Sequence, residues 1–348
     1  MRAGERIIHP FANLALSSSP EDQFAAAKIR IADRYPQSSP LPTRKPNAHG
    51  KIRIAYVSAD FCAHATAYLM AGVFEQHDKT RFELVALSNS PDDDSLVRKR
   101  LEVAFDRFIN IRRKSDAEVA ALMTEMEIDI AVDLKGFTEG GRPGIFALRP
   151  ASIQVSYLGY PGTMGADFID YIIADGTVIP EEHQTYYSEK IVRLPGSYQC
   201  NDSNRGIAER TPTRAEADLP ENGFVFCCFN NNYKITPEIF GIWMRLLHDV
   251  QGSVLWLLEG NAAASRNLRN EGAARGVVGD RLIFALRQNL ENHLARHRLA
   301  DLFLDTLPYN AHTTASDALW AGVPVLTVLG TTFGRTGCSE PLARRWVA

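Results

Sequence analysis

The alternation of short apolar runs with amphipathic helical patterns is the feature that most constrains this chain. Strands that are apolar almost throughout are buried on both faces, which is typical of a parallel sheet covered by helices. From Lys51 onward, segments with helical spacing separate runs of this kind, which are IRIAYVS, FELVALS, IDIAVDL, IQVSYLG, DYIIAD and KIVRLPG. The sequence therefore predicts a doubly wound α/β domain that binds ligands beyond the carboxyl ends of its strands.

A second series of the same kind begins with FVFCCFN and ends with PVLTVLG, after a polar segment that contains prolines. Ahead of both series, Ser19 and Pro20 predict the start of a helix that ends near Tyr35. We predict four parts, which are an N-terminal helical segment and linker at 1–50, a Rossmann-like domain at 51–200, a linker at 201–222 and a second Rossmann-like domain at 223–348.

Composition excludes several classes of protein. The 348 residues carry a formal net charge of −3, which gives no basic excess to attract nucleic acid or an acidic membrane. The five cysteines are spread along the chain without a CxxC pair, which fits neither a disulfide framework nor a zinc site. No signal-type segment or membrane-length apolar run is present in the sequence, so we expect a cytoplasmic protein.

Neither standard phosphate-binding motif occurs, because the chain has no G-x-G-x-x-G after its first strand and no G-x-x-x-x-G-K-[ST]. The segment FNNNYKI instead places Lys234 between a strand end and a helix start near Thr236. A lysine in this position suits a phosphate group. The same residues are also typical of a solvated loop lysine beside turn-forming asparagines.

The segment from Tyr309 to Gly330 reads as a loop, a helix start and a buried strand. We expect Thr313 or Thr314 to cap the helix and Gly322 to end it. Free amides and the positive end of the helix dipole would suit a phosphate over the helix start, from His312 to Thr314. An ordinary capped surface helix accounts for these residues equally well.

The triplet Asp92, Asp93 and Asp94 has two interpretations. It resembles the acidic motif of metal-dependent glycosyltransferases, but it stands between a strand and a helix, where carboxylates stabilise a helix start. We favour the cap and expect no metal.

Two loops after strands are further candidates. His64 follows the first strand at the edge where ligands bind, although an exposed loop histidine is the commoner case. In LGYPGTMGA, Pro161 and Gly162 suit a type II turn that brings backbone close to a ligand, or a plain connection.

Together these segments resemble the catalytic region of protein O-GlcNAc transferases. The resemblance covers Lys51 to Gly330 in matching order, and it is carried by DFCAHATAYLM, DLKGFTEGGRP, ALRPASIQVSYLGYPGTMGADFIDYIIAD, YYSEKIVRLP, FNNNYKI, SVLWLLEG and NAHTTASDALWAGVPV. It implies a GT-B fold, in which two Rossmann-like domains face a cleft that holds a nucleotide sugar.

The resemblance also implies roles for single residues. Lys234 and the helix start after His312 would hold the pyrophosphate, and Asp317 the ribose. His64 matches a histidine proposed in the family as a proton acceptor, although its place near the sugar fits substrate orientation as well, so its role stays open. The backbone of Gln288, together with Arg296, would meet the uracil, and Gly162 and Thr163 belong to the sugar or acceptor loop. The implied nucleotide-sugar contacts are Asn231, Lys234, Gln288, Asn289, Leu290, His293, Arg296, His312, Thr313, Thr314 and Asp317.

This chain departs from the family pattern in three respects. Asn231 stands where members often carry glutamine, and Leu290 stands where some carry a lysine, so we expect a weaker affinity for the diphosphate. After Thr332 the pattern is lost, so we expect a C-terminal part that is truncated or read in a shifted frame. The long helical repeats that usually precede the catalytic part are nearly absent from the sequence.

The sequence thus predicts a metal-independent, inverting glycosyltransferase that moves GlcNAc from UDP-GlcNAc to serine or threonine hydroxyls of proteins. Its expected partners are a UDP-sugar donor and protein acceptors, with no cofactor, no nucleic acid and no membrane. Two alternatives remain: the same fold with another donor, such as GDP-fucose or UDP-glucose, and an inactive relative that binds nucleotide or protein.

Overall fold

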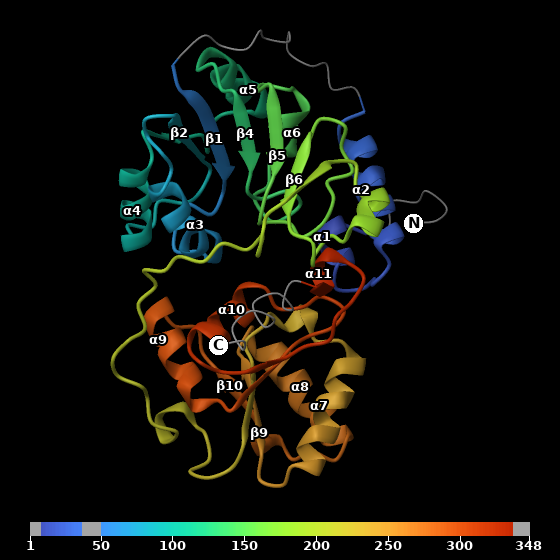
Figure 1. The fold of residues 1–348 in the computed structure, drawn as a ribbon. Helices are drawn as coiled ribbons and strands as arrows, with labels where there is room; N and C mark the ends of the chain where they lie inside the picture. The colour runs from blue at the N-terminus through green and yellow to red at the C-terminus, as the bar shows by residue number, and fades with distance from the viewer. Residues whose placement is uncertain (1–7, 37–49, 337–348) are drawn as a thin grey trace. The chain divides into compact units, whose positions relative to one another are not determined.

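The structure, a computed structural model, describes residues 8–36 and 50–336 (Figure 1). The chain divides into two compact units, Met1–Asn204 and Arg205–Ala348. This division falls inside the segment 201–222 that the sequence marks as a linker. Most of the expected N-terminal linker and the last twelve residues, 337–348, lie outside the described residues.

The first unit contains a parallel sheet of seven strands in the order β3-β2-β1-β4-β5-β6-β7. The arrowheads of β1, β4, β5 and β6 point the same way in Figure 1. The strands are β1 (Ile52–Ser58), β2 (Phe82–Ser88), β3 (Arg107–Asn110), β4 (Ile130–Asp133), β5 (Ile153–Ser156), β6 (Tyr171–Ala174) and β7 (Lys190–Arg193). The helices of this unit are α1 (Pro10–Asn13), α2 (Pro20–Arg34), α3 (Ala65–Glu75), α4 (Leu96–Ala104), α5 (Asp116–Glu125), α6 (Pro143–Ala147) and the 3-10 helix η1 (Glu181–Tyr186).

Strand order in this sheet reverses between β1 and β4. The chain builds outward from β1 through β2 to β3, and then from β4 through β5 and β6 to β7. The loops that leave neighbouring strands on the two sides of such a reversal diverge, so the carboxyl edge at this point is where doubly wound sheets bind ligands. The residues that follow β1 and β4 are therefore the first unit's best-placed candidates.

Within the first unit, the backbone of helix α2 lies close to the loop that follows β5. Ser19 caps the helix as predicted, because its side chain accepts a hydrogen bond from the Asp22 amide. Gly165 has a φ of +63°, and a Cβ built on it would lie 2.7 Å from the Lys28 nitrogen and 2.9 Å from the Ala27 Cβ. A side chain at position 165 would therefore push α2 away from the loop that follows β5.

Strand β3 was missed by the sequence prediction. It has only four residues, and none of them is fully buried. A short strand at the edge of a sheet lacks the continuous apolar run that marks the inner strands, so hydrophobic patterning does not reveal it.

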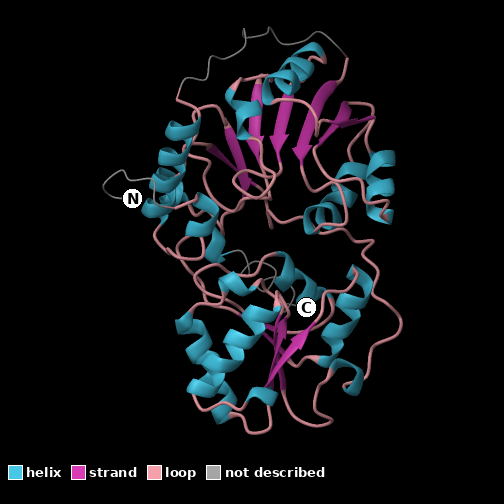
Figure 2. Ribbon diagram, turned by 180° about the vertical axis from the view of Figure 1, so that it is seen from behind, coloured by secondary structure: helices cyan, strands magenta, loops and turns pink. Residues whose placement is uncertain are grey.

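The second unit contains a parallel sheet of five strands in the order β10-β9-β8-β11-β12, with helices on both sides of the strands (Figure 2). Strand order reverses between β8 and β11. The strands are β8 (Val225–Cys228), β9 (Val254–Leu258), β10 (Leu282–Ala285), β11 (Leu302–Leu304) and β12 (Val325–Leu326). The α-helices are α7 (Pro237–Asp249), α8 (Ala262–Ala274), α9 (Leu290–Arg296), α10 (Thr313–Trp320) and α11 (Phe333–Thr336), and the 3-10 helices are η2 (Ala215–Ala217), η3 (Asn232–Lys234), η4 (Gly279–Arg281) and η5 (His297–Leu299).

The core of the second unit is built around large side chains between the sheet and its helices. Trp243 of α7, Trp256 of β9 and Phe303 of β11 are almost completely buried, as is Phe229 just after β8. Among the described residues, no helix is both long enough and apolar enough to cross a bilayer.

Candidate active site

Lys234 lies at the strand reversal of the second sheet. It ends η3, just beyond β8, and its side chain is buried. Its Nζ donates to the carbonyl oxygen of Asn310 at 2.8 Å and lies 3.6 Å from the centre of the Tyr309 ring. Contact with an aromatic face stabilises an ammonium group at a fixed place. Lys234 is therefore a buried cation whose position is fixed by its contacts, and the interpretation as a solvated loop lysine is wrong.

The loop after β11 is organised by Asp305, which sequence reasoning did not single out. Its carboxylate accepts hydrogen bonds from the Ala311 amide at 2.6 Å and from the Asn310 side chain at 2.7 Å. It also accepts one from the Thr327 hydroxyl at 2.5 Å. An acidic residue at the carboxyl end of a buried strand was the available signal. Asp305 thereby fixes the loop whose Asn310 carbonyl receives Lys234.

Asn230 joins this loop to helix α10. Its side-chain amide donates to the Thr306 hydroxyl at 2.8 Å, and its carbonyl oxygen accepts from the hydroxyl of Thr314. The predicted cap by Thr313 or Thr314 is wrong, because both residues lie inside the first turn of α10 and His312 is the N-cap residue. His312 makes no side-chain capping hydrogen bond. Gly322, with a φ of +88°, follows the end of the helix as predicted.

His312 is half-buried between Tyr309 and Phe333. It stacks on the Phe333 ring, with the ring centroids 6.4 Å apart. Burial, and next the nearby charge of Lys234, lower its pKa to about 3. His312 is therefore neutral at physiological pH, and the positive groups at this end of α10 are Lys234 and the helix dipole.

Asp317, in the second turn of α10, is paired with a residue that sequence reasoning missed. Arg205 Nη1 donates to Asp317 Oδ1 at 2.6 Å, with both side chains buried, and the guanidinium lies 4.9 Å from the centre of the Trp320 ring. Burial raises the pKa of Asp317 to about 6, against the opposing effect of Arg205. Arg205 belongs to the polar segment read as a linker, where nothing in the local pattern marks it.

The residues around α9 separate into a buried and an exposed group. Arg296 is buried against Phe229, and it donates to the Leu286 carbonyl oxygen at 2.6 Å and to His293 Nδ1 at 2.5 Å. Burial lowers the pKa of His293 to about 2 and that of Arg296 to about 10. Leu290, the first residue of α9, is half-buried, and Asn231, Gln288 and Asn289 are exposed. The side chain of Asn289 caps α9 through the Asn292 amide.

In the first unit, His64 follows β1 and is the N-cap residue of α3, where its Nδ1 accepts from the Thr66 amide at 3.2 Å. The same nitrogen lies 3.3 Å from Asp60 Oδ2. Asp60 in turn is bound through both oxygens to Lys135, which follows β4, at 2.8 and 2.7 Å. Sequence reasoning missed Asp60 and Lys135, since only the strand order brings the two loops together.

The loop after β5 is fixed by a buried carboxylate. Glu189 accepts from the Thr163 hydroxyl and from the Met164 amide, both at 2.6 Å. The hydroxyl of Thr163 is thus engaged within the protein. The predicted type II turn is wrong, because Gly162 does not have the positive φ that this turn requires, whereas Leu158 and Gly165 do have positive φ.

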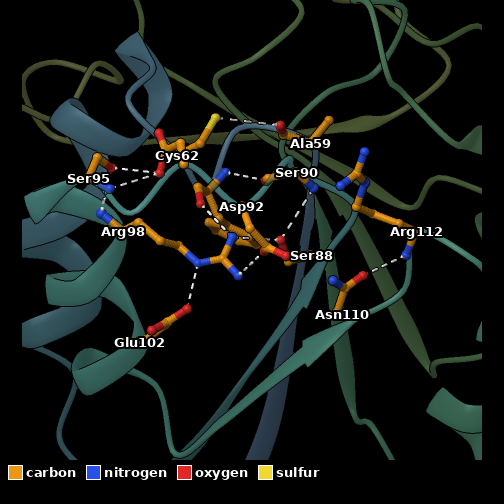
Figure 3. A network of polar contacts seen from close by, with 12 residues as sticks. Ala59, Cys62, Ser88, Ser90, Asp92, Ser95, Arg98, Glu102, Asn110 and Arg112 are labelled. Atoms are coloured by element: carbon orange, nitrogen blue, oxygen red, sulfur yellow. Dashed lines mark hydrogen bonds and ion pairs between the residues drawn. The ribbon is translucent and has the colours of Figure 1, made fainter.

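Two residues of the acidic triplet, Asp92 and Asp93, have partners within the protein, but neither is the cap residue of the following helix. Ser95 caps α4, and Asp93 supports that cap by accepting from the Ser95 hydroxyl at 2.8 Å and from the Ala63 amide at 2.5 Å. Asp92 forms an ion pair with Arg98, which also binds Glu102 at 2.6 Å (Figure 3). Across residues 8–36 and 50–336, no group of three or more His, Cys, Asp or Glu side chains is arranged to hold a metal.

The two sheets with their reversals, and the buried cation at the second reversal, define a GT-B glycosyltransferase fold. Among solved structures, a mutant of the Thermobaculum terrenum O-GlcNAc transferase has a TM-score of 0.84 and 32% identity, covering 96% of this chain and 65% of its own. Anabaena HepE in complex with UDP and glucose shares only the fold, at 13% identity and a TM-score of 0.50, covering 84% of this chain and 88% of its own.

The chain belongs to glycosyl transferase family 41, whose model matches residues 20–209 and 207–343. A probable UDP-N-acetylglucosamine–peptide N-acetylglucosaminyltransferase of Arabidopsis thaliana, SEC, is 39% identical over 316 residues, which are 88% of this chain and 32% of that protein. The enzyme of that name from Caenorhabditis elegans is 26% identical over 80% of this chain and 34% of its own length. The chain spans about a third of the length of these relatives.

Proposed function

We propose that this chain transfers GlcNAc from UDP-GlcNAc to serine or threonine hydroxyls of proteins, with inversion at the anomeric carbon. The observation that carries the proposal is the joint position of Lys234 and the start of α10 at the strand reversal of the second sheet. Supporting it, the Arabidopsis relative named for this activity is 39% identical over most of this chain.

The chemistry requires stabilisation of a leaving group. The acceptor oxygen bonds to the anomeric carbon as the bond from that carbon to the β-phosphate oxygen breaks, and its electron pair leaves with UDP. In our proposal the diphosphate lies against the Lys234 ammonium and the amide end of α10, where negative charge is stabilised as it develops. The acceptor's proton leaves to a basic group or to water.

Recognition of the nucleoside is assigned by the same proposal to Asp317 and to the segment that leads into α9. Asp317 is held by Arg205, so its second oxygen is the candidate acceptor for a ribose hydroxyl. Gln288, Asn289 and Asn231 are exposed, with the Asn289 side chain capping α9 and Asn231 Oδ1 accepting from Arg287. The side chain of Arg296 is 2% exposed, so any uracil contact at this position involves the surrounding backbone more than its guanidinium.

A thermal-shift comparison of UDP, GDP and their sugars tests the donor assignment. A ligand at a hundred times its dissociation constant adds about 2.7 kcal/mol to the free energy of unfolding. We expect UDP and UDP-GlcNAc to raise the Tm and GDP and GDP-fucose to leave it unchanged. A selective response to GDP would favour another donor on the same fold, and no response to any nucleotide would contradict the proposal.

Activity should survive chelation. Lys234 and the α10 amides would supply the positive charge at the diphosphate, while Asp92 and Asp93 are engaged by Arg98 and by the cap of α4. UDP release from UDP-GlcNAc is therefore expected to be equal with EDTA and with magnesium. A loss of UDP release in EDTA that is reversed by manganese or magnesium would contradict this prediction and indicate that the acidic triplet binds a metal.

A further inference from the structure

Two loops meet at the strand reversal of the first sheet through a buried ion pair. Asp60 follows β1 and Lys135 follows β4, and their side chains are 9% and 6% exposed. The Lys135 ammonium contacts both carboxylate oxygens of Asp60, which also accept the Thr66 hydroxyl at 3.1 Å. Lys135 therefore neutralises the Asp60 carboxylate, and Lys135 and Thr66 supply it with hydrogen-bond donors without any contribution from His64.

The hydrogen bond that His64 accepts determines the position of its hydrogen. A ring nitrogen that accepts a backbone N–H carries no hydrogen, so in neutral His64 the hydrogen is on Nε2. The alternative tautomer would place the hydrogen on Nδ1, pointed at Asp60 Oδ2 at 3.3 Å, and leave Nε2 bare to take a proton. Nδ1 cannot make both interactions at once, so Asp60 and the Thr66 amide compete for it.

We propose that Lys135 is a positioning residue that determines which of these two groups, the Thr66 amide or Asp60, interacts with Nδ1 of His64. By holding both oxygens of Asp60, it keeps His64 neutral with its hydrogen on Nε2, so that the ring meets its substrate as a hydrogen-bond donor. The substrate part of the inference rests on the proposed function. The His64 side chain is 48% exposed, so a ligand can reach the ring.

The charges that act on His64 agree with this arrangement. Burial is the largest influence and lowers the pKa of His64, Asp60 raises it, and Lys135 lowers it again. Without Lys135, only burial would oppose the effect of the carboxylate on the ring. An uncompensated anion this close both favours the imidazolium and draws the hydrogen of the neutral ring to Nδ1.

Nitrogen NMR of the ligand-free protein tests the proposal directly. The chain has nine histidines, so the His64 signals are identified by their absence from His64→Gln. In the native protein we expect Nδ1 to be bare and Nε2 to carry hydrogen. In Lys135→Met we expect the hydrogen to move to Nδ1 and the pKa of His64 to rise by about one unit or more.

Two variants control for indirect effects. Lys79→Met removes another lysine–aspartate pair of the same unit, Lys79 with Asp106, and should leave His64 unchanged. Asp60→Asn/Lys135→Met removes the carboxylate as well as the lysine, so the Nε2–H tautomer should return. A folded Lys135→Met protein in which the tautomer and pKa of His64 are unchanged would overturn the proposal. If Lys135→Met does not fold, the native protein provides the test, because a hydrogen on Nδ1 of native His64 would also overturn the proposal.

Kinetics separate a donor from a base. The amide of glutamine can donate where His64 Nε2–H donates but cannot accept a proton as a base, so His64→Gln should keep at least tenfold more kcat/KM than His64→Ala. Equal losses in the two variants would indicate a base. The NMR result stands without turnover, so a failure of the proposed transfer activity leaves this inference separately testable.

Discussion

Replacing Lys234 by alanine is expected to lower turnover by about a hundredfold, or about 3 kcal/mol, while weakening donor binding much less. Negative charge on the leaving diphosphate grows as the glycosidic bond breaks, so a fixed cation stabilises the transition state more than the bound donor. The contacts with the Asn310 carbonyl oxygen and the Tyr309 ring keep the ammonium in place for this role. Steady-state UDP release, analysed for kcat and KM separately, measures the effect.

Two variants make this prediction specific. Lys234→Met keeps an apolar stem over Tyr309 and removes only the charge, so it should be as slow as the alanine variant. Lys190→Ala removes an exposed lysine that lies over the ring of Tyr171 in the first unit, 5.9 Å from its centre, and should retain native turnover. A Lys234→Ala protein that turns over at the native rate, or that only raises KM, would make Lys234 a binding contact.

Replacing Arg205 by methionine is expected to destabilise the second unit by about 3 to 5 kcal/mol, because a buried carboxylate loses its partner. Asp317 would remain enclosed near Ser316 and Trp320 without the guanidinium that now donates to it. Denaturant unfolding measures the loss. The double variant Arg205→Met/Asp317→Leu should recover most of the lost stability, since no buried charge then remains.

The loss should depend on pH in a defined direction. The pKa of Asp317 is raised from 3.8 to about 6 in the folded protein, so this carboxyl costs stability as pH rises through that window. Removing Arg205 raises the folded-state pKa further, so the deficit of Arg205→Met should be largest above pH 7 and shrink below about pH 6. The exposed pair Arg210–Glu216 is the control, where Arg210→Met should leave stability nearly unchanged across the same pH range.

Hydrophobic patterning predicted the fold because the inner strands here are mainly apolar, with few polar residues among them. Strands β1 and β2 begin and end where the pattern places them, and Ser19 caps α2 as predicted. Local spacing carries this information, because the period of the apolar residues and the capping side chains lie within one element.

The site was predictable only in part. Lys234 was identified from its place between a strand and a helix, whereas its burial over Tyr309 depends on a loop about 75 residues away. Arg205 and Lys135 were missed because their partners, Asp317 and Asp60, are distant in sequence and no local pattern links them. The threonine cap of α10 was misplaced by one or two residues, since the backbone at His312 rather than side-chain type decides where that helix begins.

Transfer of the sugar itself tests the central claim most directly. The chain is incubated with UDP-GlcNAc and a library of serine- and threonine-containing peptides, with Lys234→Ala in parallel, and both UDP release and peptide mass are followed. The account predicts UDP release together with peptides heavier by one N-acetylhexosamine, and about a hundredfold less of both with the variant. The account would be contradicted by a folded native chain that modifies no peptide with UDP-GlcNAc, whether it uses another nucleotide sugar as donor or transfers no sugar at all.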